Sequence, residues 1–240
     1  MADSSSGDGA DQRSREELNQ RLHDAAFAGD VVKLREAIAA GADVEAPLLE
    51  RRGHNNRAVK TKPLCCVVRA SRVQQNRREK GRTACVRALL DAGASASEAV
   101  VLYESMNPRM NPPVYTALHN AAYCGLDTIC RLLIDAGADL NAQTRGNYTP
   151  LSYAAIHKHH RLVVLLLSRG ATTDFESADH FETYYSPGYL GRIRLAGGFA
   201  NYQKQQRARL MAMLAPKMDH LLPPELVSHV ITFWGHLGWT

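Results

Sequence analysis

Four Gly-Ala dipeptides, each placed after an apolar run, constrain this chain more than any other feature. They begin at Gly41, Gly93, Gly137 and Gly170, and the last two lie 33 residues apart. A period of this length is typical of solenoids in which each repeat is one supersecondary unit. Such a unit cannot cover its own apolar face, so neighbouring units must stack. The chain is therefore expected to form a stack of short helical units.

A second marker repeats with the same offset. The segments Thr116–Ala122 and Thr149–Ala155 are also 33 residues apart. A threonine just before a helix accepts a backbone N–H that the helix leaves unpaired, and Pro150 suits the first helical position. Gly125 can take the positive φ that turns the chain into a second helix. Each unit is thus predicted to hold two short antiparallel helices.

These motifs resemble those of ankyrin-repeat proteins over residues 19–174. The resemblance implies an all-α fold, an α-solenoid of about four repeats with long hairpin-like finger loops and a helical C-terminal cap. Repeat two departs most from the pattern, with Cys65 at the motif histidine and an insertion from Ser71 to Lys80 between its helices. In repeat four, Lys158 stands where the turn glycine is usual, so a strained turn is expected there.

The chain is divided on this basis into four parts. Residues 1–18, rich in Ser, Gly, Asp and Arg, are predicted to be a disordered tail. Residues 19–174 form the repeat domain and 175–198 an irregular connector. Residues 199–240 form a C-terminal helical cap or an F-box-like segment, with one helix starting near Phe199 and ending before Pro216.

The segment beginning Leu222-Pro-Pro-Glu-Leu resembles the opening helix of an F-box, or the C-terminal box of viral ankyrin proteins. That resemblance implies docking to a ubiquitin-ligase component, which would make the chain a substrate adaptor. A helix that only caps the last repeat is the alternative, because terminal repeats expose an apolar face.

Positive charge is concentrated in one stretch. The net charge is +5, but residues 51–87 hold twelve Lys or Arg and one acid, so they carry +11 and the rest of the chain −6. Such a stretch could meet nucleic acid, an anionic surface or an acidic protein, or remain solvated. Aromatic residues that would stack on bases are not interleaved with it, which disfavours nucleic acid. The basic patch is assigned to Arg51, Arg52, Arg57, Lys60, Arg72, Arg77, Arg78 and Lys80.

Catalytic, cofactor and metal sites are not predicted. The histidines at motif positions, His119 and His159, have structural roles in the resemblance, and Cys65 and Cys130 fall on core-facing helix positions. The five cysteines suggest reduced thiols in an intracellular protein, cytoplasmic or nuclear. Neither a signal sequence nor a membrane span is expected from the hydropathy.

The expected function is that of a non-enzymatic protein–protein interaction module. In the resemblance, partners are bound by the concave face, built from finger tips and the exposed side of the first helices. Aromatic side chains at these positions are the best candidates for anchors. The positions carried over are Asn120, Tyr123, Cys124, Gln143, Arg145, Tyr148, Tyr153, Ile156 and His157.

Overall fold

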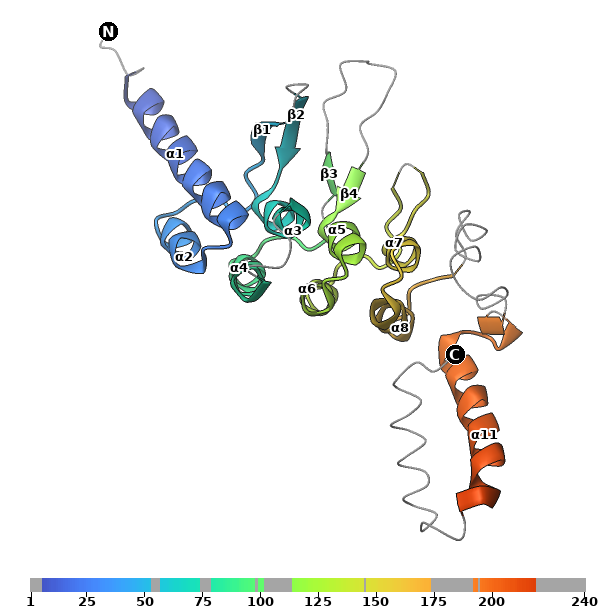
Figure 1. The fold of residues 1–240 in the computed structure, drawn as a ribbon. Helices are drawn as coiled ribbons and strands as arrows, with labels where there is room; N and C mark the ends of the chain where they lie inside the picture. The colour runs from blue at the N-terminus through green and yellow to red at the C-terminus, as the bar shows by residue number, and fades with distance from the viewer. Residues whose placement is uncertain are drawn as a thin grey trace.

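Four helix pairs stack side by side in the computed structural model of the chain (Figure 1). The structure describes residues 6–52, 57–73, 79–97, 99–101, 114–144, 146–173, 192–193 and 195–218. The first helices of the pairs, called the inner helices, are α1 (Ser6–Ala28), α3 (Pro63–Val73), α5 (Ala117–Cys124) and α7 (Pro150–Ile156). The second, outer helices are α2 (Val31–Ala39), α4 (Glu79–Asp91), α6 (Asp127–Asp135) and α8 (His160–Ser168). The predicted all-α solenoid of about four repeats is confirmed.

Long fingers join the helix pairs. In the first finger, β1 (Leu48–Arg52) pairs antiparallel with β2 (Arg57–Thr61), and in the second, β3 (Ala99–Val101) pairs with β4 (Val114–Thr116). Figure 1 shows these hairpins rising from the side of the inner helices, with the outer helices on the far side. The predicted hairpin-like fingers are therefore present as short two-stranded sheets.

The helix starts follow from the threonines. Thr116 accepts the His119 N–H at 3.3 Å and Thr149 accepts the Ser152 N–H at 3.2 Å. The side chains of His119 and Ser152 in turn accept the backbone N–H of Thr116 and Thr149, so both starts are closed capping boxes.

The helix ends follow from the glycines. The four Gly-Ala glycines have φ between 84° and 95°, in the region that glycine alone enters without strain. Lys158 takes the place of the turn glycine with φ 58°, as expected from the sequence. The turn of repeat four is therefore held in a conformation that costs an L residue free energy.

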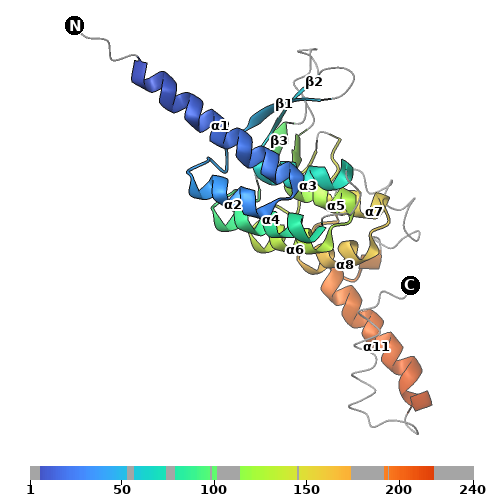
Figure 2. The same cartoon turned by 60° about the vertical axis from the view of Figure 1, so that its left-hand side comes forward.

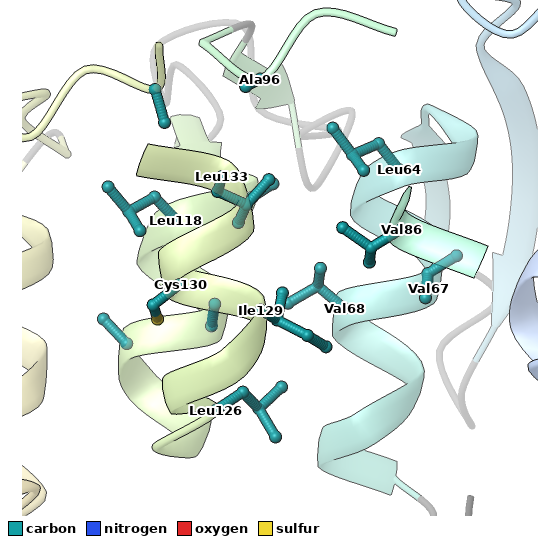
Figure 3. Packing of buried hydrophobic residues seen from close by; sticks show 14 of the residues in the cluster. Leu64, Val67, Val68, Val86, Ala96, Leu118, Leu126, Ile129, Cys130 and Leu133 are labelled. Carbon is teal, nitrogen blue, oxygen red and sulfur yellow. The ribbon is translucent and has the colours of Figure 1, made fainter. Parts of the chain in front are cut away.

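One continuous core runs between the helix layers. Figure 3 shows Val68 of α3 and Ile129 of α6 meeting between the second and third helix pairs. Both side chains are buried, as are Leu118 and Leu133 beside them. Each repeat thus buries its apolar face against the next repeat, as a solenoid requires.

The N-terminal helix differs from the disordered tail predicted for residues 1–18. Helix α1 begins at Ser6, although residues 1–5 lie outside the described residues. Leu18 and Leu22 pack on the core and anchor the helix. It continues toward the N-terminus although Gly7 and Gly9 have poor helix propensity. Gln12 and Glu16, which lie one helical turn apart, stabilise this part of the helix through a hydrogen bond from Gln12 Nε2 to Glu16 Oε1 (3.5 Å).

Two further helix limits differ from the sequence-based expectation. Helix α3 runs to Val73 and α4 begins at Glu79, so part of the insertion in repeat two lengthens its helices. Helix α11 (Phe199–Met218) begins where predicted but continues past Pro216. A proline this close to the helix end removes one backbone hydrogen bond from the last turn, because it has no N–H, and leaves the preceding turns intact.

The C-terminal part packs on the last helix pair of the stack. Ile193 and Phe199 are buried in the same core cluster, Tyr202 packs against it, and α11 contacts α8. Figure 2 shows α1 and α11 at opposite ends of the stack. Residues 222–234, which hold the F-box-like motif, lie outside the described residues. None of the helices in the described ranges has the length and apolar character to cross a membrane.

Candidate functional site

Four tyrosines from two adjacent repeats gather on the inner helices and finger bases, and are called here the tyrosine strip: Tyr115, Tyr123, Tyr148 and Tyr153. Tyr153 lies at its centre. Its ring centroid is 5.9 Å from that of Tyr115, 6.0 Å from that of Tyr123 and 5.7 Å from that of Tyr148. All four side chains are half-buried, so each keeps exposed surface while its ring packs on a neighbour. Aromatic pairs at these separations attract one another, which orders the strip before any ligand arrives.

Local structure holds the two finger tyrosines. Tyr115 lies in β4, directly before the helix cap Thr116, and Tyr148 lies directly before the cap Thr149. Thr144 fixes the backbone of Tyr148, because its N–H donates to the Tyr148 carbonyl at 2.9 Å and its hydroxyl accepts the Tyr148 N–H at 3.2 Å. The Tyr148 ring lies so close to Gly146 that a Cβ there would be 2.9 Å from Cε2.

Motif histidines hold the backbone under the strip. His119 donates from Nε2 to the Tyr148 carbonyl at 3.1 Å, and His159 donates from Nε2 to the Tyr123 carbonyl at 3.1 Å. The structural roles expected for His119 and His159 are therefore confirmed. Burial lowers the pKa of His119 to about 4, so its ring is neutral at physiological pH. Both bonds reach into the adjacent repeat, so they fix the two tyrosines relative to each other.

Two hydroxyls of the strip are joined by a hydrogen bond. Tyr153 donates its O–H to the Tyr115 hydroxyl oxygen at 3.0 Å. Burial, followed by this hydrogen bond, raises the pKa of Tyr153 far above its usual range. The strip is consequently a neutral surface of ring faces and edges with hydroxyl groups between them. His157 extends it, with its ring centroid 4.0 Å from that of Tyr123.

Four of the nine predicted contact positions lie in the strip or contact it. Tyr123, Tyr148, Tyr153 and His157 are brought together by the ring contacts given above. The other exposed or half-buried predicted positions are Cys124, Gln143 and Ile156.

Two of the predicted positions are not placed at a binding surface. Asn120 is only 8 % exposed, because its short side chain stands at the motif position of Tyr153 without reaching as far outward. It therefore offers little surface to a partner. Arg145 lies outside the described residues.

Tyr115 is the residue that sequence reasoning missed. It precedes Thr116 as Tyr148 precedes Thr149, at the same 33-residue offset as the helix caps. Applying the repeat period to Tyr148 would have found it. The position was overlooked because it belongs to a finger whose length breaks the regular spacing.

The basic patch is described only in part. Arg51, Arg52, Arg57 and Lys60 lie on strands β1 and β2, where Arg52 pairs with Arg57 across the hairpin. Arg72 lies in α3, and Arg77 and Arg78 lie outside the described residues. Among the eight patch residues, the structure describes the side chain of Lys80 alone, and that side chain is exposed.

A neighbouring lysine of the same basic stretch is engaged within the stack. Lys62 Nζ lies 2.6 Å from Glu45 Oε2, and Glu45 Oε1 also accepts the Ser95 N–H at 2.6 Å. This carboxylate therefore links neighbouring repeats and offsets one positive charge of the stretch.

The cysteines behave as small core groups. Cys65 and Cys130 are buried as expected, and burial raises the pKa of Cys65 to about 12 and that of Cys130 beyond the usual thiol range. Cys85 is also buried, and its pKa is raised by burial to about 11. Thiols in this state are poor nucleophiles and poor metal ligands. Within the described ranges, His, Cys, Asp and Glu do not form a group of three or more that could hold a metal ion.

Comparison with known proteins agrees with this architecture. Residues 79–178 match the family model described as ankyrin repeats (3 copies). An ankyrin and IPT/TIG repeat-containing protein of Schizosaccharomyces pombe is 36 % identical over 86 residues, which cover 36 % of this chain and 8 % of that protein. An ankyrin repeat-containing protein of Treponema pallidum is 42 % identical over 62 residues, which cover 26 % of this chain and 21 % of the relative.

A third relative is named as a kinase. The serine/threonine-protein kinase VIK of Arabidopsis thaliana is 36 % identical over 67 residues, which cover 28 % of this chain and 15 % of the kinase. The matches thus span less than a quarter of each of these relatives. The helix pairs, capping boxes and family match together show that this chain contains ankyrin repeats, which are protein-interaction modules and generally not enzymes.

Proposed function

We propose that the chain binds a partner protein with the tyrosine strip, on the concave side of repeats three and four. The observation that carries the proposal is the convergence of four half-buried tyrosines from two adjacent repeats, with Tyr153 at their centre. Tyrosine supplies a large contact area, loses little rotamer freedom on binding, and is enriched among the residues that dominate interface energies.

The strip is held in place before binding. The His119 and His159 bonds fix the backbone of Tyr148 and Tyr123, and the ring contacts restrict the side chains. Ordering side chains on association costs free energy, and a surface that is already ordered avoids part of that cost. The proposal therefore expects affinity to reside in a few aromatic anchors rather than in the whole concave face.

A partner-capture experiment with two single variants tests this. The full chain, Tyr123→Ala and Tyr148→Ala would each be immobilised, and captured proteins would be identified and quantified. An anchor tyrosine is expected to cost about 2 kcal/mol on truncation, which corresponds to a loss of affinity of roughly 30-fold. Either variant should then recover little of the partner that the native chain retains.

Val32→Ala is the matched control. Val32 is an apolar residue of α2 that is 62 % exposed, away from the strip. Its truncation should leave recovery unchanged. Partner recovery that is unaffected by both tyrosine variants, with their folding verified by circular dichroism, would refute the proposal.

The adaptor role remains a prediction about residues 222–240, where the F-box-like motif stands. Deleting them should abolish association with a ubiquitin-ligase scaffold while the repeats stay folded. Aggregation or unfolding of the deleted chain would instead favour a cap. We also propose the domain division given above, with the stack ending at residue 174, a connector over 175–198 and a cap over 199–240. The packing of Ile193, Phe199 and Tyr202 on the core of the stack supports it.

Nucleic-acid or anionic-surface binding through residues 51–87 also remains a prediction. Such binding would weaken steeply with salt. If any nucleic-acid affinity were unchanged on replacing Arg51, Arg52, Arg77 and Arg78 together, this prediction would be wrong.

A further inference from the structure

We propose that the tyrosine strip takes an extended, proline-rich segment of its partner. This inference rests on the proposed function and adds the chemical class of the ligand. Three properties of the strip support it: its charge, its hydroxyl groups and its length.

The centre of the strip is uncharged. The groups that act on the Tyr153 hydroxyl are the hydroxyls of Tyr115, Tyr148 and Thr144. A cationic ligand would gain most from ring faces that enclose it, but the Tyr153 ring already packs against four other rings, those of His119 and the other three tyrosines. The exposed Lys158, which follows α7, would also repel a cationic ligand bound near it. The surface therefore suits a neutral ligand.

The hydroxyls suit a backbone with unpaired carbonyl groups. The Tyr153 O–H donates a hydrogen bond to the Tyr115 hydroxyl oxygen, so the O–H of Tyr115 can donate to a different acceptor. A polyproline II segment makes no internal hydrogen bonds, so its carbonyl oxygens are available to such donors. Its pyrrolidine rings present flat apolar faces to aromatic side chains, and the conformation is largely formed before binding.

The length of the strip fits a short segment of this kind. From Tyr148 through Tyr153 and Tyr123 to His157, successive ring centroids are 5.7, 6.0 and 4.0 Å apart. A polyproline II helix advances about 3.1 Å per residue, so this path has room for at most about five residues.

Selection from a random-peptide phage library on the full native chain tests the inference. Enriched peptides would be synthesised with a fluorophore, and their dissociation constants measured by anisotropy against native, Tyr153→Phe, Tyr153→Ala and Val32→Ala chains. We expect enriched peptides to share prolines spaced by one or two residues. Tyr153→Ala should weaken them by roughly 30-fold and Tyr153→Phe, which keeps the ring, by roughly fivefold.

The outcomes separate this inference from the proposed function. Enriched peptides that lack proline but lose affinity in Tyr153→Ala would overturn the proline-rich ligand and leave the strip as the binding surface. Peptides that bind the Tyr153→Ala chain as tightly as the native chain would overturn both. A selection that enriches no peptide, with labelled decaproline also failing to bind, would overturn the inference as well.

Discussion

Replacing His119 by Ser should remove a pH-dependent part of the stability of the stack. Ser152 stands at the same motif position in repeat four and completes an equivalent capping box, so the variant copies a solution already present in the chain. It removes the imidazole and its bond to the Tyr148 carbonyl, which is 3.1 Å long. At pH 7 we expect the loss of this buried bond to cost about 1 to 3 kcal/mol.

The pH dependence follows from the lowered pKa of His119. Burial lowers this pKa from 6.5 to about 4, so below pH 6.5 the unfolded chain takes up a proton that the folded chain refuses. The stabilising contribution is therefore complete above pH 6.5 and is lost as the pH falls toward 4. Between pH 7 and pH 4.5 the difference amounts to about 2 kcal/mol.

Urea unfolding followed by circular dichroism at several pH values measures this contribution. Other titrating groups affect both chains alike, so the difference between native and His119→Ser chains isolates the histidine. The native chain should lose about 2 kcal/mol more than the variant between pH 7 and pH 4.5. Parallel pH profiles would show that the ring is not buried in its neutral form, and the reasoning would fail.

Four further substitutions test the turns and the core. Gly125→Ala should lower the free energy of unfolding by about 2 to 4 kcal/mol, because φ is 69° and a Cβ would lie 2.5 Å from the His159 ring. Gly137→Ala, with open space around the new Cβ, should lower it by only about 1 to 2 kcal/mol. Equal losses for the two variants in urea unfolding would contradict the close approach of His159 to Gly125. Ile129→Ala should cost about 2 to 5 kcal/mol, since the side chain is 1 % exposed between repeats two and three, and a loss below about 1 kcal/mol would mean that this junction is not packed. Lys158→Gly should raise the melting temperature, because it relieves a positive φ at a gain of up to about 1 kcal/mol; a lower melting temperature would argue against the left-handed turn.

Local rules of helix capping made much of the fold predictable. Thr116 and Thr149 start helices because their hydroxyls accept the N–H of the third helical residue, and the Gly-Ala glycines end them with positive φ. Both requirements involve only neighbouring residues. The sequence alone therefore located the helix pairs of the regular repeats.

Features that depend on tertiary packing were less predictable. Helix α1 extends to Ser6 because its C-terminal half is anchored on the core, a contact that composition does not report. Helix α3 extends to Val73 inside a predicted insertion for which no motif gave a helix limit. Tyr115 joins Tyr153 only because two repeats stack, which brings residues 38 positions apart into a 3.0 Å hydrogen bond.

Photocrosslinking from the tyrosine strip tests the central claim most directly. A benzoylphenylalanine would replace Tyr148 in one full chain and Val32 in another, and each would be irradiated with the captured partner. The account predicts a crosslinked partner from position 148 and none from position 32. Crosslinks from position 32 with none from position 148 would contradict the claim that the strip is the partner-binding surface.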